Sequence, residues 1–451
     1  MELFGSSGTR GTVGEAMTPS LALRVARAAG TVWDADRVAV ARDTRTSGRM
    51  LADAAASGLA SVGVDADRLG TLPTPGAAAF CEREGTPAVV VTASHNPPEY
   101  NGMKLLGADG VELTVDALER VERHVFDEPV AEATWDEVGG TRRVDDAGRR
   151  YVADLLDAAD RGRVADADLT VAVDPGHGAG ALTSPEFLRR LGCRVVTTNA
   201  QPDGHFPGRD PEPVAENLGD LRRLVRAAGA DLGVAHDGDA DRAVFVDETG
   251  TVVPGEASLA ALAAAELDAG DAVVAAVNAS QRLVDVVEDA GARLELTPIG
   301  ATNIVTRVRE LRADGVPVPI AGEGNGGVFF PDYRLSRDGA YVAARFLELV
   351  ADRPASEVVA PHLDYHFVRR GIEYGDEDER EALMAAATEY AAAADVDPDT
   401  TDGYRLDFGD AWTLVRPSGT EPKVRVYAEA REPDRAEALA NDLVEIMESA
   451  R

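Results

Sequence analysis

Short apolar runs alternate with helical patterns along most of this chain, and several runs end in a glycine-rich or polar loop. The runs Val38–Ala41, Ala88–Val91 and Leu169–Val173 are typical of strands buried on both faces. Helical patterns such as Ser20–Ala29 and Leu51–Val62 lie between such runs. Strands that alternate with helices in this way predict parallel sheets that helices cover on both faces.

The last part of the chain departs from this alternation. After Pro354 comes a strand pattern, Tyr365–Arg369, and then an alanine-rich helical pattern, Asp376–Ala393. Three further strand patterns lead to a final helix, Asp434–Ser449. This order predicts an α+β unit of fewer than ~100 residues rather than another doubly wound one.

The length fits several domains. At ~100–200 residues per domain, 451 residues correspond to roughly three or four. The polar, acidic stretch from Phe126 to Arg150 contains little core and makes a plausible domain edge. We expect three doubly wound α/β domains and a C-terminal α+β domain, with bounds 1–147, 148–246, 247–355 and 356–451.

The charge composition restricts the partners. A net charge of −34 argues against nucleic acid and anionic membranes, which both require a basic face. Of the 45 basic residues only Lys104 and Lys423 are lysine, which is typical of a protein from a salt-saturated cytosol, where charges are screened within ~3 Å at 1 M salt. The two lysines are candidates for a role that arginine cannot fill, since lysine can release its proton near neutral pH.

The cysteines suit a reducing compartment, and the lengths of the apolar runs bear on secretion and membrane insertion. Cys81 and Cys193 lie far apart and form neither a disulfide framework nor a zinc motif. The first residues have no basic start and no apolar core typical of a secretory signal. No uncharged apolar run approaches the ~18–20 residues of a membrane span. We expect a cytoplasmic protein.

A serine follows one of the buried strands. The stretch Thr92–Lys104 comes directly after Ala88–Val91, and its two prolines and glycine disfavour helix and strand alike. It presents the hydroxyl of Ser94, the imidazole of His95 and, further on, the ammonium of Lys104. The end of a buried strand is where α/β domains place their chemistry. A rigid surface turn is the alternative interpretation.

Three aspartates at alternate positions predict a metal site. Asp237, Asp239 and Asp241 follow a strand pattern, and only glycine and alanine separate them. With Glu248 they also fit positions 1, 3, 5 and 12 of an EF-hand calcium loop. That alternative fails at position 6, where Arg242 replaces the required glycine, and the flanks are strands rather than helices. Three carboxylates with open positions suit Mg²⁺ shared with a phosphate oxygen.

Two other segments carry phosphate-binding groups. Arg416–Lys423 offers a guanidinium, two hydroxyls and backbone N–H groups between two strand patterns. It lacks the spacing of a Walker A loop, so a nucleoside triphosphate is not implied. The glycine- and hydroxyl-rich opening, Phe4–Gly11, places Arg10 where it could bind phosphate, although a flexible terminus is the commoner explanation.

The run Gly322–Gly327 matches the dinucleotide-binding pattern G-x-G-x-x-G. The following Val328–Pro331 continues as strand and then breaks, so no helix receives a pyrophosphate, and we reject NAD. Glu323 and Asn325 instead suit hydrogen bonds to sugar hydroxyls or an amine.

Together these segments resemble the α-D-phosphohexomutase superfamily. Thr92–Pro97 is similar to its phosphoserine loop, Asp237–Arg242 to its magnesium loop, Gly322–Gly327 to its sugar loop and Arg416–Pro422 to its phosphate loop. The motifs occur in the family's order along nearly the whole chain. The resemblance implies four domains around a central cleft.

The resemblance also implies a mechanism. Phospho-Ser94 would donate its phosphoryl group to a sugar phosphate, and the resulting bisphosphate would return its other phosphate to Ser94. Such transfer depends mostly on positioning and charge neutralisation. Lys104 would act as general base or acid with a pKa lowered by cations such as Arg10 and Arg242. The implied site comprises catalytic Ser94, Lys104, Arg10 and His95; Mg²⁺ ligands Asp237, Asp239, Asp241 and phospho-Ser94; sugar-binding Glu323, Asn325, Arg242 and Gly300; and phosphate-binding Arg416, Ser418, Gly419, Thr420 and Arg425.

The substrate implied is a hexose phosphate, with a sugar 1,6-bisphosphate as activator. Members that act on glucose or mannose phosphates often have Ser and His in the sugar loop, where this chain has Asn325 and Gly327. The chain therefore looks closer to archaeal phosphoglucosamine mutases, with phosphomannomutase, phosphoglucomutase or phosphopentomutase specificity as alternatives. A metal-dependent phosphatase and a non-catalytic calcium or sugar-phosphate binder are the competing functions. We expect a monomer or homodimer.

Overall fold

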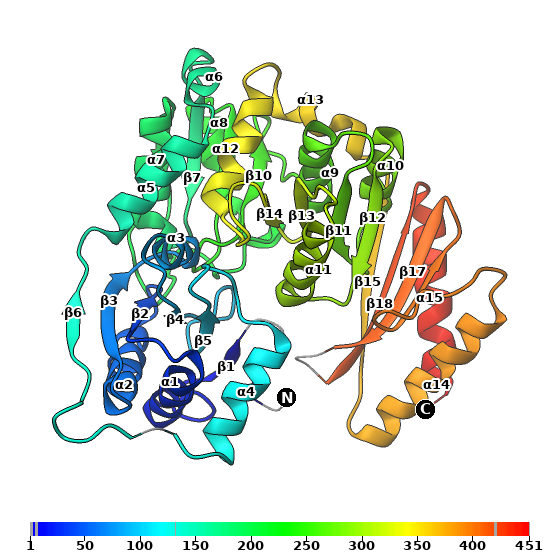
Figure 1. The fold of residues 1–451 in the computed structure, drawn as a ribbon. Coiled ribbons are helices and arrows are strands. Elements are labelled where there is room, and N and C mark those ends of the chain that lie inside the picture. The colour runs from blue at the N-terminus through cyan, green and yellow to red at the C-terminus, as the bar shows by residue number, and fades with distance from the viewer. Residues whose placement is uncertain (1–2, 5–7, 131, 419–421, 451) are drawn as a thin grey trace. The chain divides into compact units, whose positions relative to one another are not determined.

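The structure is a computed structural model that describes every residue except 1–2, 5–7, 131, 419–421 and 451. It contains four domains, three with mixed or parallel sheets and a last one with an antiparallel sheet (Figure 1). By contacts the chain forms two compact units, Met1–Ser258 with Asn325–Val358 and Leu259–Gly324 with Val359–Arg451. Among the residues described, no helix has both the length and the apolar character needed to cross a bilayer.

The first domain has a six-stranded mixed sheet in the order β1-β5-β4-β2-β3-β6. The strands β2, β3, β4 and β6 are parallel, whereas β5 pairs antiparallel with β4 and with β1. Its elements are β1 (Thr9–Thr12), α1 (Pro19–Trp33), β2 (Arg37–Arg42), α2 (Gly48–Ser61), β3 (Asp65–Thr71), α3 (Thr74–Glu84), β4 (Ala88–Val91), β5 (Tyr100–Leu106), α4 (Val115–Phe126) and β6 (Thr141–Arg143).

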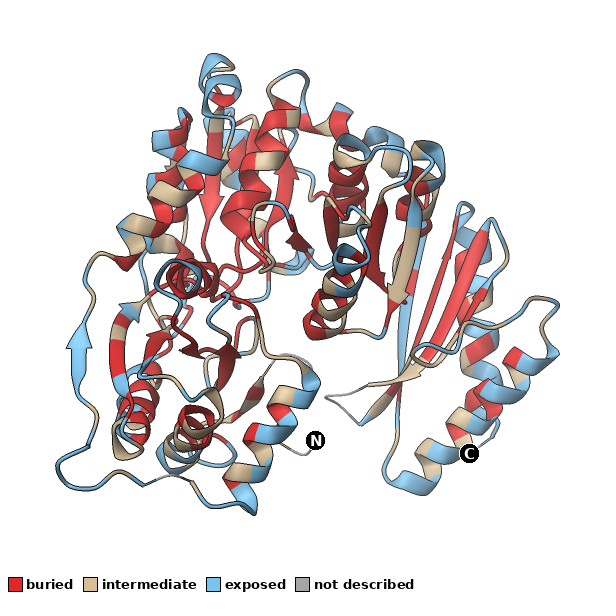
Figure 2. Cartoon of the chain, in the orientation of Figure 1, coloured by how far each residue is buried: buried red, intermediate tan, exposed pale blue. Residues whose placement is uncertain are grey.

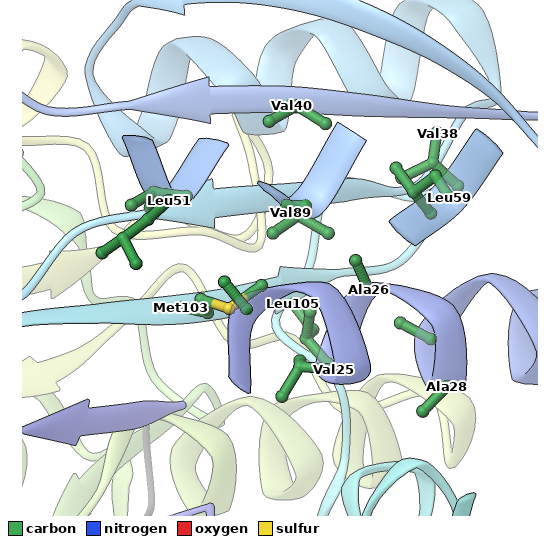
Figure 3. Packing of buried hydrophobic residues seen from close by; sticks show 14 of the residues in the cluster. Val25, Ala26, Ala28, Val38, Val40, Leu51, Leu59, Val89, Met103 and Leu105 are labelled. Carbon is green, nitrogen blue, oxygen red and sulfur yellow. The ribbon is translucent and has the colours of Figure 1, made fainter. Parts of the chain in front are cut away.

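Helices cover both faces of this sheet because the strand residues alternate between two cores. Val38 and Val40 of β2 pack with α1, α2 and α4, together with Val89 and Met103 (Figure 3). Their neighbours in β2 and β4 point the other way, into a core with α3. This period-2 division is what a doubly wound domain requires.

The second domain has the sheet β10-β9-β7-β8, in which β7, β8 and β9 are parallel and β10 is antiparallel. Its elements are α5 (Ala147–Ala158), α6 (Arg161–Asp166), β7 (Thr170–Asp174), η1 (Ala179–Leu182), α7 (Ser184–Leu191), β8 (Arg194–Thr197), η2 (Ala215–Asn217), α8 (Gly219–Ala228), β9 (Leu232–Ala235) and β10 (Val244–Asp247). The first unit also includes β14 (Gly327–Phe329) and α12 (Gly339–Val350).

The second unit combines parts of the third and fourth domains. In the third, β11 lies between β12 and β13 and is parallel to both. In the fourth, the antiparallel order is β15-β18-β17-β16, and α14 and α15 pack on one face. The elements of these two domains are α9 (Gly255–Glu266), β11 (Ala272–Ala276), α10 (Gln281–Ala290), β12 (Arg293–Thr297), α11 (Ala301–Ala313), β13 (Ile320–Glu323), α13 (Ala355–Val359), η3 (Ala360–His362), β15 (His366–Glu373), α14 (Glu377–Ala393), β16 (Tyr404–Asp407), β17 (Ala411–Pro417), β18 (Lys423–Ala430) and α15 (Pro433–Glu448). The start of α9 and nearly all of α13 belong to the first unit.

The structure differs from the sequence-based expectation at three strands. Lys104 lies within β5 and Arg10 within β1, where only loops were expected. The acidic stretch Phe126–Arg150 contributes an edge strand, β6, which is exposed along its length (Figure 2). No helix follows β14 directly, as the sequence predicted: an isolated bridge joins Phe330 to Arg334, and α12 begins only at Gly339.

Candidate active site

Ser94 lies buried in the loop after β4. Its φ of +50° is in the left-handed region, which residues other than glycine rarely adopt. Its backbone N–H donates to Thr92 Oγ1 at 2.9 Å, and its hydroxyl donates to Asp237 Oδ2 at 2.6 Å and lies 3.3 Å from His95 Nδ1. A strained backbone that turns a buried hydroxyl toward a carboxylate is typical of a functional site and does not fit a plain surface turn.

The three aspartates converge between β9 and β10. One carboxylate oxygen from each of Asp237, Asp239 and Asp241 lies within 4.8 Å of the others, and all three residues are buried. Glu248, the twelfth position of the calcium-loop alternative, accepts a hydrogen bond from the Ser356 amide instead. The flanking strands and this diverted carboxylate both contradict an EF-hand.

The residues present fit a hard divalent cation. In Asp239 and Asp241 the Oδ2 atoms accept hydrogen bonds. Their Oδ1 atoms are buried and have no hydrogen-bond partner among the described residues. Buried carboxylate oxygens are normally paired, and an unpaired one requires an explanation such as an ion. Three carboxylates with open positions are the donor set of a Mg²⁺ site that retains water or phosphate ligands.

Several cations surround the triplet. Lys104 Nζ lies 2.8 Å from both Asp239 Oδ2 and Asp241 Oδ2, and Arg337 Nη2 lies 2.7 Å from Asp241 Oδ2. Arg242 Nε is 3.9 Å from Asp237 and 3.8 Å from Asp241. Arg10, Arg242 and Lys104 thus add positive charge beside Ser94, as phosphoryl transfer requires.

The expectation of a lowered pKa for Lys104 is wrong. Burial alone would lower that pKa, but the facing carboxylates of Asp239 and Asp241 outweigh burial and raise it above its ordinary value. An ammonium held in this way carries a proton at neutral pH, so it can donate a hydrogen bond or neutralise charge but is a poor base.

Two other groups near Ser94 are held in their neutral forms. Burial, together with the negative charges of Asp241 and Asp239, raises the pKa of Asp237 to about 8. Burial and the nearby Arg242 and Arg10 lower the pKa of His95 to about 2, so its imidazole is uncharged at neutral pH. The carboxyl that accepts the Ser94 hydroxyl is therefore protonated until a cation replaces its proton.

Binding of Mg²⁺ is expected to release a proton. With a pKa of about 8 for Asp237, about nine-tenths of a proton should leave per Mg²⁺ bound at pH 7 and about one-tenth at pH 9. As the pH increases toward 8, the affinity for Mg²⁺ should rise by about tenfold per pH unit, because fewer protein molecules must first lose the Asp237 proton. Isothermal titration calorimetry in two buffers of different ionisation enthalpy measures the number released. A release that does not change between pH 7 and pH 9 would contradict the assignment.

The structure brings together most of the residues predicted for the first unit and adds others. Ser94, His95, Lys104, Arg10, Arg242 and the three aspartates form one cluster. Sequence reasoning missed Thr74, whose hydroxyl donates to Asp239 Oδ2 at 2.6 Å, and Arg337. Neither lies in a motif, and each meets its partner across about a hundred residues or more of chain, so no local pattern could reveal it.

The remaining predicted residues lie mostly in the second unit. Arg416 and Arg425 are directly opposite each other on β17 and β18, which places two guanidinium groups on one face of the sheet. Glu323 ends β13, and Gly300 precedes α11 with a φ of +131°. Asn325 lies in the first unit, where its side chain accepts a hydrogen bond from the Gly327 amide. The predicted Gly419 and Thr420 lie outside the described residues.

Family models match the chain from end to end. They are described as phosphoglucomutase/phosphomannomutase alpha/beta/alpha domain I at residues 1–131, domain II at 149–250, domain III at 254–365 and the C-terminal domain at 375–446. The fold is thus that of a four-domain phosphoglucomutase/phosphomannomutase scaffold. The chain belongs to the α-D-phosphohexomutase superfamily.

Individual relatives match over nearly their whole length. A "Phosphoglucomutase/phosphomannomutase" of Thermococcus kodakarensis is 40% identical, covering 100% of this chain and 99% of the relative. A "Probable phosphoglucosamine mutase" of Methanopyrus kandleri is also 40% identical, covering 98% and 97%. The crystal structure of a phosphoglucomutase/phosphomannomutase family protein from Burkholderia thailandensis superposes with a TM-score of 0.87 at 27% identity, covering 99% and 97%.

Proposed function

We propose that this protein is a phosphosugar mutase that moves a phosphoryl group between the 6- and 1-positions of glucosamine phosphate through phospho-Ser94. The observation that carries the proposal is the 2.6 Å hydrogen bond from the Ser94 hydroxyl to Asp237 of the aspartate triplet. A nucleophile, a cation site and several basic side chains then meet at one buried point, which is what phosphoryl transfer needs.

The residues of the site have distinct roles in this reaction. Asp237, Asp239 and Asp241 would hold Mg²⁺, which when bound neutralises charge on a phosphoryl oxygen. The Ser94–phosphorus bond breaks as a sugar oxygen bonds to phosphorus; the attacking hydroxyl loses a proton and Ser94 Oγ ends with one, so none is consumed. Lys104 keeps its proton and stabilises negative charge as an ammonium.

The second unit supplies groups for the rest of the substrate. Arg416 and Arg425, opposed on neighbouring strands, are suited to a phosphate because guanidinium groups bind phosphate oxygens in pairs. Glu323 of the same unit offers carboxylate oxygens for the sugar, and an acidic side chain suits the amine of glucosamine; Asn325, which belongs to the first unit, offers an amide group. The choice of glucosamine phosphate is also supported by the names of several relatives, which are given as "Probable phosphoglucosamine mutase".

The substrate is tested by kcat/KM for glucosamine, glucose, mannose and pentose phosphates, each with Mg²⁺ and the matching sugar 1,6-bisphosphate. We expect the highest value with glucosamine phosphate, and little turnover when the bisphosphate is left out and Ser94 is unphosphorylated. A higher kcat/KM with another sugar would reassign the substrate. Release of inorganic phosphate at the rate of sugar phosphate loss would instead identify a phosphatase.

A further inference from the structure

A buried arginine lies behind the Ser94 loop and takes no part in the reaction described above. Arg45 precedes α2, and only 1% of its surface is exposed. Its Nη2 donates to the carbonyl oxygens of Ser94 at 2.9 Å and Asn96 at 2.5 Å, and its Nη1 to those of Pro97 at 2.5 Å and Tyr100 at 2.9 Å. Four carbonyl groups of the Ser94 loop and the start of β5 therefore converge on a single guanidinium.

The fifth N–H of Arg45 links it to the same loop by a second route. Arg45 Nε donates to Asp43 Oδ2 at 3.1 Å, and that oxygen also accepts the Thr92 hydroxyl at 2.8 Å. Thr92 Oγ1 in turn accepts the backbone N–H of Ser94 at 2.9 Å. All five donors of the guanidinium are thus used, and both the amide and the carbonyl of Ser94 are fixed by this network.

The second domain covers the guanidinium from the other side. The ring of Phe206 lies 5.2 Å from the Arg45 guanidinium carbon, within the range of a cation–π contact. Gly204 packs on the backbone around Arg45, where a Cβ would come within 2.4 Å of Thr44 O and Thr46 N. Arg209, three residues after Phe206, donates to the carbonyl oxygen of His236, next to the metal loop, at 2.6 Å.

We propose that Arg45 is a positioning residue for phosphoryl transfer, which holds Ser94 in its left-handed conformation with the hydroxyl directed at Asp237. The inference rests on the proposed function, since it assigns a role to Arg45 only if Ser94 carries the phosphoryl group. Without the guanidinium, four carbonyl groups would lose their shared donor, including that of the buried Ser94, and the loop would relax toward ordinary φ values. Lysine cannot replace arginine here, because an ammonium has three donors and no planar fork.

The test uses Arg45→Lys and Arg45→Ala in the full-length protein. A displacement of Ser94 by about 1 Å should lower kcat by about 100-fold, with KM changed less than about threefold. The rate at which a sugar 1,6-bisphosphate phosphorylates Ser94, followed by intact mass, should fall in parallel. Guanidinium ions should partly restore the activity of Arg45→Ala, whereas potassium at the same concentration should not.

The matched control is Arg405→Lys. Arg405 is also buried, donates to the carbonyl oxygens of Val277 and Ala279 at 2.6 and 2.9 Å, and lies 4.2 Å from the ring centre of Trp412 in the second unit. Its replacement should lower stability but leave kcat within about threefold of wild type, because it does not touch the Ser94 loop. Amide hydrogen exchange at residues 94–96 and 99–100 should accelerate in the Arg45 variants only.

The outcomes separate this inference from the proposed function. If wild-type protein neither turns over sugar phosphates nor takes a phosphoryl group at Ser94, the proposed function fails. If wild type is active and folded Arg45 variants keep kcat within about threefold, Arg45 is not a positioning residue. If neither Arg45 variant folds, Thr92→Val decides the question: we expect about tenfold lower kcat and faster exchange of the Ser94 amide, and unchanged values of both would overturn the inference.

Discussion

Replacement of Ser94 by alanine is expected to lower kcat by about 10⁴-fold or more, because it removes the nucleophile rather than a supporting group. The Ser94 hydroxyl is buried and lies 2.6 Å from Asp237 Oδ2. Alanine at position 94 has no hydroxyl that could carry the phosphoryl group. The variant should also gain no mass on incubation with a sugar 1,6-bisphosphate. Steady-state kinetics and intact mass spectrometry measure both effects.

Ser57→Ala is a suitable control for this experiment. Ser57 is exposed on α2, and its hydroxyl only donates to the Asp53 carbonyl oxygen at 2.9 Å. Its replacement should change neither kcat nor the uptake of one phosphoryl group. Substantial turnover by Ser94→Ala would show that the phosphoryl group does not pass through this serine.

Asp237→Asn is expected to separate metal binding from folding. At pH 7, with a chelator present, the variant should melt at a higher temperature than wild type, because burial and the neighbouring carboxylates raise the pKa of Asp237 to about 8, so that unfolding of wild type is favoured by release of this proton, whereas asparagine titrates in neither state. Wild-type protein should gain about 2.7 kcal/mol of stability at a Mg²⁺ concentration 100 times its Kd. The variant should gain almost none and lose about 100-fold or more in kcat. Thermal unfolding with and without Mg²⁺ checks the first two statements.

The sign of the pH dependence follows from the same pKa. A carboxyl whose pKa is raised in the folded state lowers stability as the pH rises from about 4, its ordinary pKa, to about 8, because only the unfolded chain releases the proton in that range. Wild-type protein without Mg²⁺ should therefore lose stability relative to Asp237→Asn across this range, and the difference should level off above pH 8. Asp220→Asn, on the surface of α8 beside Arg223, is the control and should behave as wild type throughout. Equally tight Mg²⁺ binding by Asp237→Asn and wild type would refute the assigned ligand.

Much of the fold could be predicted because the cores have a simple period. The run Ala88–Val91 is a strand at those bounds, and alternate residues of β2 enter opposite cores. The strand Tyr100–Leu106 could not be recognised, because Pro97 and Pro98 suggested a loop that continued through it. The edge strand β6 carries only threonine and arginine, and it owes its pairing to β3 rather than to its own hydrophobicity.

The site could be predicted where a motif holds its chemistry in one stretch. The three aspartates occur at alternate positions of one loop, so their convergence followed from their spacing. Arg337 and Thr74 approach the triplet from distant segments, which no local pattern reveals. The pKa of Lys104 is set by Asp239 and Asp241, two carboxylates of the second domain that face it. The sequence shows the nearby arginines but not this contact, so it predicted a lowered pKa where the pKa is raised.

The central claim is that one phosphoryl group passes from sugar to Ser94 and back to sugar. The direct measurement is to label Ser94 from a ³²P sugar 1,6-bisphosphate, remove the excess, and add unlabelled glucosamine 6-phosphate with Mg²⁺. We predict that the label leaves the protein at the rate of turnover and appears in sugar phosphates. Label that remains on Ser94 during turnover, or that leaves only as inorganic phosphate, would contradict the claim.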